Sequence, residues 1–121
     1  MRVLIVEDER LIALHLEMLV TELGYEVCGI AVSELEAIAS ATAHRPDVVL
    51  MDIRLADGSS GFDAARKIHA AHSLRCIFLS GNLDEKTRLA LQPYEPIGFV
   101  GKPILSSELR SALEKAEGLS H

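Results

Sequence analysis

The stretch Asp47-Val48-Val49-Leu50-Met51-Asp52 decides the fold, because a carboxylate directly follows a short, continuous apolar run. Continuous apolar residues, several of them β-branched, are typical of a strand covered on both faces, as in parallel sheets. A buried helix can carry a similar run, but helices usually need about ten residues or more, and this run is about half that length. Ligands of open α/β sheets bind at the carboxyl ends of the strands. Asp52 is therefore the first candidate functional residue.

Length and composition predict one globular domain spanning residues 1–121, because 49% of the residues are hydrophobic and 25% are charged. A net charge of −6 without a dense basic run argues against nucleic acid as a direct partner. No apolar segment approaches the roughly 20 residues of a membrane span. The acids Glu7 and Asp8 end the first apolar run too early for a signal peptide. We therefore expect a cytoplasmic protein that does not bind a membrane.

Strand-like and helix-like apolar spacing alternates five times along the chain. The expected strands are 2–6, 26–32, 48–52, 75–80 and 97–101, and the expected helices are 9–23, 33–44, 61–71, 84–91 and a last one from 106. Ser33 with Glu36 forms a capping-box pattern, and Ser106 is the expected cap of the last helix. This alternation predicts an α/β fold, a doubly wound parallel sheet of flavodoxin-like (βα)5 topology with strand order 2-1-3-4-5.

The two cysteines, Cys28 and Cys76, fall in the expected second and fourth strands. In the predicted order these strands are not neighbours, whereas a disulfide needs Cα atoms within about 7 Å. We expect both cysteines to be reduced core residues.

Four of the five expected strands end in reactive or polar residues, which are Glu7-Asp8, Asp52, Ser80 and Lys102. Because the carboxyl ends of parallel strands share one edge, these residues are expected to meet in one crevice. Crowded carboxylates repel one another, and a divalent cation such as Mg²⁺ relieves that repulsion with oxygen ligands. Carboxylate, Mg²⁺, lysine and hydroxyl together predict a receptor for a phosphoryl group, with one carboxylate as the acceptor.

Here the chain resembles the receiver domain of two-component response regulators, including the chemotaxis receivers, over essentially its full length. Four motifs carry the resemblance, namely Val6-Glu7-Asp8-Glu9, Met51-Asp52, Ser80-Gly81 and Lys102-Pro103. The resemblance implies that Asp52 accepts a phosphoryl group from a sensor histidine kinase or a histidine phosphotransfer protein. It also implies a Mg²⁺ ion bound by Asp8 and Asp52, by the backbone carbonyl of Arg54, and by Glu7 through water.

The same resemblance assigns the switch. Ser80 and Lys102 would bind phosphoryl oxygens, with a cis bond between Lys102 and Pro103, and Phe99 would occupy the aromatic switch position. Phosphorylation would then shift the face formed by the fourth helix, fifth strand and fifth helix, where a downstream protein target binds or a homodimer forms. The segment 56–61 and the stretch Pro96 to Pro103 are also similar to receivers of the alphaproteobacterial general stress response.

Two other classes of function compete with a signalling switch. A Mg²⁺-dependent aspartyl phosphohydrolase would be an enzyme, but enzymes of the haloacid dehalogenase type carry a second aspartate where this chain has Arg54. A receiver-like scaffold would keep the fold without phosphorylation, which the complete set of site residues argues against. The chain starts at Met1 and ends soon after the last expected helix, so we expect a stand-alone receiver, although an excised domain would have the same sequence.

Overall fold

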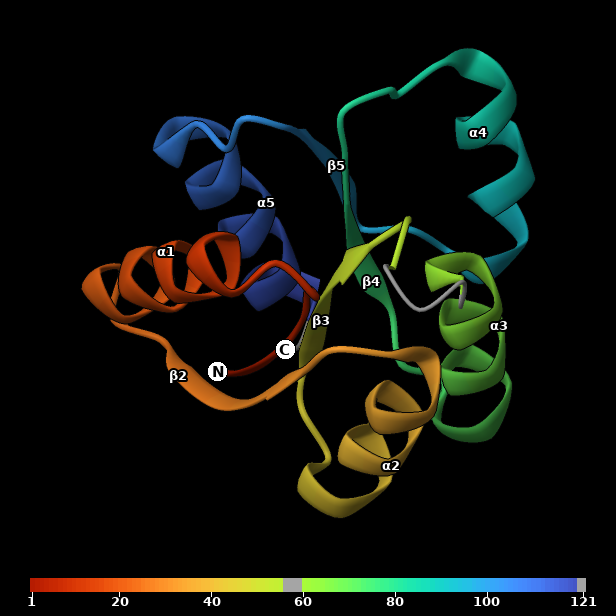
Figure 1. Ribbon diagram of the computed structural model, residues 1–121, viewed down its shortest axis with the longest axis horizontal. Helices are drawn as coiled ribbons and strands as arrows, with labels where there is room; N and C mark the ends of the chain where they lie inside the picture. The colour runs from red at the N-terminus through yellow and green to blue at the C-terminus, as the bar shows by residue number, and fades with distance from the viewer. Residues whose placement is uncertain (56–59, 120–121) are drawn as a thin grey trace.

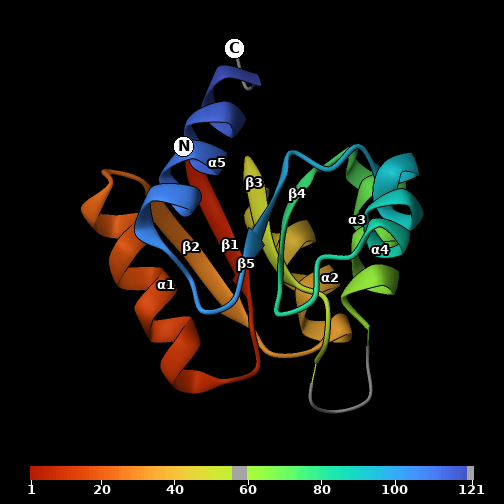
Figure 2. The same ribbon diagram turned by 90° about the horizontal axis from the view of Figure 1, so that it is seen from above.

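The computed structural model describes residues 1–55 and 60–119, and a central parallel sheet has helices on both of its faces (Figures 1 and 2). The strands are β1 (Arg2–Val6), β2 (Glu26–Ala31), β3 (Val48–Asp52), β4 (Cys76–Ser80) and β5 (Gly98–Gly101). The helices are α1 (Arg10–Glu22), α2 (Glu34–His44), α3 (Gly61–His72), α4 (Glu85–Leu91) and α5 (Ser106–Leu119), with a 3₁₀ turn, η1 (Gln92–Tyr94), after α4.

The strand order is β2-β1-β3-β4-β5, which confirms the predicted doubly wound topology. In the register of the parallel ladder, Val6 pairs with Met51, and Asp52 pairs with Leu79. The last residues of β1, β3 and β4 are therefore neighbours at one edge of the sheet. This register brings the chain segments that follow these strands together although they are distant in sequence.

Alternating side chains of β3 enter two different cores, which explains its continuous apolar run. Val48 and Leu50 pack with Leu16 of α1 and Leu109 of α5 on one face. Val49 and Met51 pack on the other face, which α2, α3 and α4 cover (Figure 2). Every residue of β3 is buried, so a strand in this position needs apolar residues at successive positions.

Most predicted boundaries are correct within one residue, and one predicted cap is wrong. The side chain of Ser33 caps α2 by accepting a hydrogen bond from the Glu36 N–H at 3.2 Å. Ser106, however, is the first helical residue of α5, because the Leu105 carbonyl accepts the first intrahelical hydrogen bond, from the Leu109 N–H at 3.1 Å. The cap position therefore belongs to Leu105, whose side chain has no acceptor.

Both cysteines are free thiols, as predicted, but only Cys76 is a buried core residue, whereas Cys28 is partly buried and packs against the core. Burial raises the pKa of the Cys76 thiol to about 12, which keeps it protonated and unreactive. Within residues 1–55 and 60–119, no helix combines the length and the apolar character needed to cross a membrane.

Candidate functional site

A pocket of about 440 Å³ opens at the carboxyl ends of β1, β3, β4 and β5. It is lined by the side chains predicted from the strand ends together with their neighbours, namely Asp8, Glu9, Asp52, Arg54, Leu55, Ser80, Gly81, Asn82 and Lys102. The fold thus brings Asp8, Asp52, Ser80 and Lys102 into one crevice, as the alternation of strands and helices predicted. Glu7 does not line the pocket and lies beneath it, with no exposed surface.

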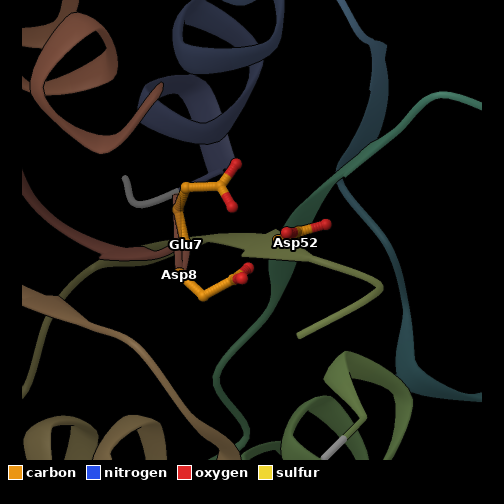
Figure 3. A group of neighbouring side chains, drawn as sticks. All are labelled: Glu7, Asp8 and Asp52. Carbon is orange, nitrogen blue, oxygen red and sulfur yellow. The ribbon is translucent and has the colours of Figure 1, made fainter. Parts of the chain in front are cut away.

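Three carboxylates gather at this edge, from Glu7 and Asp8 after β1 and from Asp52 at the end of β3 (Figure 3). One oxygen from each lies within 4.8 Å of the others, and Asp52 is only 4% exposed. Oxygen donors at this spacing suit a hard divalent cation such as Mg²⁺. Of the three, only Asp8 is partly exposed and also lines the pocket, so it offers the most accessible ligand.

Lys102 bridges two of these acids. Its Nζ lies 2.8 Å from Glu7 Oε1 and 3.2 Å from Asp52 Oδ2. Burial opposes the charge of the ammonium, but the hydrogen bond with Glu7 and the charges of Asp52 and Glu7 outweigh burial and raise the pKa of Lys102. A permanently charged lysine compensates one carboxylate, and the remaining acidic charge favours binding of a divalent cation.

The pKa of Glu7 is shifted by its buried surroundings. Burial, together with the adjacent Asp52, raises the pKa of Glu7 to about 7, although Lys102 opposes this shift. Its second oxygen accepts a long hydrogen bond, 3.4 Å from the Glu9 N–H. The sequence indicated an acid here, but it carried no sign that Glu7 would be Lys102's partner, 95 residues away.

The Asp52 carboxylate is held by the backbone that follows it. The Arg54 N–H donates a hydrogen bond to Asp52 Oδ1 at 3.2 Å, which fixes the turn after β3. The Arg54 side chain is exposed, and the residue lines the pocket. A molecule that reaches Asp52 through the pocket therefore passes the Arg54 guanidinium.

Ser80 lies at the pocket, but its hydroxyl is engaged locally. It donates to the Asn82 carbonyl at 3.2 Å and accepts from the Asn82 N–H at 3.1 Å. Asn82 was not predicted as a site residue. Its position two residues after a strand-end serine is the only sequence signal, because a short turn after Ser80-Gly81 returns the chain to the pocket.

Phe99 lies on β5 opposite Phe78 of β4. The two rings are stacked with centroids 5.9 Å apart, and the Arg88 guanidinium carbon lies 4.7 Å from the Phe99 centroid. Phe99 is partly buried, so it is neither plain core nor free surface. The peptide bond between Lys102 and Pro103 is cis, as predicted.

Comparison with known proteins settles the family. The model of the response regulator receiver domain matches residues 3–114. This chain belongs to the receiver domain family. Receiver domains are signalling modules that take a phosphoryl group on an aspartate and generally bind Mg²⁺, in agreement with the acid cluster seen here.

Individual relatives agree with this assignment. The phyllosphere-induced regulator PhyR of Methylorubrum extorquens is 37% identical over 115 residues, which span 94% of this receiver and 42% of PhyR. The transcriptional regulatory protein PdtaR of Mycobacterium tuberculosis is 35% identical over 119 residues, which span 95% of this receiver and 56% of PdtaR. The receiver thus spans about half the length of these curated relatives.

Solved structures show the same fold. The signal receiver domain of a modulated diguanylate cyclase from Desulfovibrio desulfuricans superposes with a TM-score of 0.87 at 34% identity, covering 98% of this chain and 94% of that one. The response regulator PhyR from Brucella abortus gives a TM-score of 0.83 at 37% identity, covering 98% of this chain and 48% of that one.

Proposed function

We propose that this receiver is a phosphorylation switch in which Asp52 is the phosphoacceptor. The observation that carries the proposal is the position of Asp52, which lines the pocket beside Asp8 and lies 3.2 Å from the Lys102 ammonium. Asp52 is 4% exposed, so its carboxylate is poorly hydrated and available as a nucleophile only from the pocket. A nucleophile, an adjacent cation and a cluster of oxygen donors are the parts that phosphoryl transfer needs.

Mg²⁺ would be held by Asp8 and Asp52, by the backbone carbonyl of Arg54, and by Glu7 through a water molecule. When bound, the ion supplies positive charge that neutralises phosphoryl oxygens during transfer. The indirect role of Glu7 is supported by its contact with Lys102, which already occupies one of its oxygens at 2.8 Å. The donor set is entirely oxygen, as Mg²⁺ requires.

The transfer would proceed by attack of an Asp52 carboxylate oxygen on the phosphorus of a phosphohistidine. The new oxygen–phosphorus bond forms as the phosphorus–nitrogen bond of the donor breaks, and the imidazole leaves with its electron pair. Lys102 exchanges its contact with Asp52 for one with a phosphoryl oxygen. Ser80 gives up its hydrogen bond to the Asn82 carbonyl and donates to another phosphoryl oxygen, which draws the loop after β4 toward the site.

The rearranged loop would then act on Phe99 and on the surface formed by α4, β5 and α5. The partners proposed are a sensor histidine kinase or histidine phosphotransfer protein as the donor and a downstream protein target on this surface. A homodimer through the same surface is an additional proposal. An apolar side chain of α4, Leu89, is 62% exposed, which supports a protein partner on this surface.

The experiment is intact mass spectrometry after incubation with Mg²⁺ and acetyl phosphate. The expected result is an adduct of one phosphoryl group that hydroxylamine or base removes and EDTA prevents. Asp52→Asn should abolish the adduct, whereas Asp63→Asn, at an exposed acid on α3, should keep it.

Absence of the adduct in the wild-type protein has two possible causes, rapid dephosphorylation or an incompetent pocket. Titration with beryllofluoride and Mg²⁺, followed by NMR, distinguishes them. Shifts of the strand-end residues that extend to the surface formed by α4, β5 and α5 would retain the switch, and a spectrum without shifts would reject it in favour of a scaffold.

A further inference from the structure

Gly61, the first residue of α3, is pressed against the backbone of the proposed phosphoacceptor. A Cβ atom built on Gly61 would lie 2.0 Å from the Asp52 carbonyl oxygen, and 2.9 Å from both the Asp52 carbonyl carbon and the Ile53 Cα. Real Cβ atoms essentially never approach other atoms within 3.0 Å. All three obstructing atoms belong to the backbone, so no side-chain rotation can make room.

Backbone contacts on both sides of Gly61 hold it against the Asp52–Ile53 peptide. The Gly61 N–H donates to the Ile53 carbonyl at 3.0 Å, and Arg54 and Ser60 form an isolated antiparallel bridge. The Ser60 side chain then caps α3 by accepting from the Phe62 N–H at 3.1 Å. The start of α3 is thereby attached to the two residues that follow Asp52.

Helix α3 cannot easily retreat from this contact. Its inner face is formed by Ala64, Ala65 and Ile68, which are each at most 1% exposed and pack in the core with β3. Interiors at this packing density resist a shift of a whole helix. A side chain at position 61 would therefore displace the Asp52–Ile53 peptide rather than the helix.

Displacement of this peptide would move the reacting carboxylate. The Asp52 side chain starts at this peptide, and its two oxygens depend on contacts of 3.2 Å to the Arg54 N–H and to the Lys102 Nζ. We infer that Gly61 is a positioning residue for phosphoryl transfer. Because it has no side chain, α3 can pack against the Asp52 peptide and keep the Asp52 carboxylate in place beside Asp8 and Lys102. This inference rests on the proposed function of Asp52.

Other glycines near the site provide a contrast. A Cβ on Gly101, directly before Lys102, would meet nothing within 4 Å. Gly101→Ala is therefore a matched control that adds the same methyl group at another strand end. Ile68→Val is a second control, since it perturbs the packing of α3 without touching Asp52.

The test compares Gly61→Ala with these two controls and the wild-type protein. The readouts are the phosphorylation rate at saturating acetyl phosphate and Mg²⁺, the Mg²⁺ affinity from calorimetry, and the melting temperature. For Gly61→Ala we expect a rate about a hundredfold lower, because misplacement by about 1 Å costs that much. We also expect Mg²⁺ binding about tenfold weaker, as for other changes that misorient a ligand. Both controls should retain the wild-type rate and affinity, even where Ile68→Val lowers the melting temperature.

A wild-type rate and affinity in folded Gly61→Ala would overturn the inference, as would an equal loss in Ile68→Val. Should Gly61→Ala be unfolded in buffer, the comparison is repeated for all four proteins in trimethylamine N-oxide, which favours the folded state. Failure to fold even there would also overturn the inference, because Gly61 would then serve the fold as a whole. If the wild-type protein gives neither a phosphoryl adduct nor a response to beryllofluoride, the proposed function fails, and Mg²⁺ affinity alone still decides whether Gly61 positions the carboxylate.

Discussion

Ion pairs of nearly equal length lie at the amino ends and at the carboxyl ends of the strands, called here the amino edge and the carboxyl edge of the sheet. Only the pair at the carboxyl edge is largely buried. At the carboxyl edge, Lys102 Nζ lies 2.8 Å from Glu7 Oε1, with side chains 21% and 0% exposed. At the amino edge, Arg2 Nε lies 2.9 Å from Glu26 Oε2, with side chains 43% and 66% exposed. Water and salt screen the second pair but have little access to the first.

Distance alone therefore does not indicate what a charge pair does. The amino-edge pair contributes little to stability, because solvent solvates the partners well when they are apart. At the carboxyl edge, three acids and one lysine form a poorly hydrated cluster. Without a further positive charge, this arrangement destabilises the folded state. Such an edge is explained by the cation and the phosphoryl group that it is proposed to receive.

The largest expected effect comes from removing the lysine. Lys102→Met keeps much of the side-chain volume but leaves Glu7 and Asp52 without their cation. Since breaking a buried pair strands a charge, we expect the free energy of unfolding at pH 8 to fall by about 3 kcal/mol in urea denaturation. Excess Mg²⁺ should restore part of this loss, because it returns positive charge to the cluster. A loss no larger than that of an exposed pair would show that the two edges are energetically alike.

The next effect is stabilisation by the metal. Mg²⁺ at about ten times its dissociation constant should stabilise the folded receiver by about 1.4 kcal/mol, because only the folded state assembles the ligands. Thermal unfolding with and without EDTA measures this shift. Asp8→Asn removes the most accessible ligand and should abolish most of the shift. Equal stabilisation of wild type and Asp8→Asn would move the metal site away from this edge.

A smaller effect is expected at Phe99, within β5, where a cation lies against an aromatic ring instead of beside a carboxylate. Arg88 covers the Phe99 ring at 4.7 Å and also donates from its Nε to the Leu83 carbonyl at 3.2 Å. A double-mutant cycle with Arg88→Ala and Phe99→Leu should give a coupling energy of about 0.5–1 kcal/mol. Beryllofluoride should reduce this coupling if Phe99 moves in the switch. Coupling that is identical with and without beryllofluoride would show that the contact between Arg88 and Phe99 does not change in the switch.

The smallest effect is expected at the amino edge. Glu26→Gln breaks the pair with Arg2, and the free energy of unfolding should fall by about 0.5 kcal/mol at low ionic strength. Raising the salt concentration should erase this difference, because both partners are exposed. Urea denaturation at two salt concentrations checks it. A loss of stability that equals the Lys102→Met value, or that persists at high salt, would show that the amino-edge pair is not screened by solvent.

Much of the fold was readable from local patterns. The apolar run 48–51 and the five alternations predicted the parallel sheet and its order, because strand and helix periodicities differ and crossovers have one hand. The capping prediction was correct for Ser33, whose side chain accepts a hydrogen bond from its own helix. It was wrong for Ser106, because α5 begins one residue earlier than predicted and Ser106 is already helical. Boundaries depend on which carbonyl accepts the first helical hydrogen bond, and residue type predicts this only loosely.

The sequence by itself determined which residues stand at the strand ends, since Glu7, Asp8, Asp52, Ser80 and Lys102 follow from periodicity alone. Their roles in phosphoryl transfer stay predictions. Only the tertiary structure decided the contacts among them: Lys102 with the buried Glu7, Ser80 with its own loop, and Gly61 against the Asp52 peptide. The physical reason is that periodicity places a residue on a face or at an edge. Contacts at 2–4 Å, by contrast, depend on how segments far apart in the sequence pack against one another.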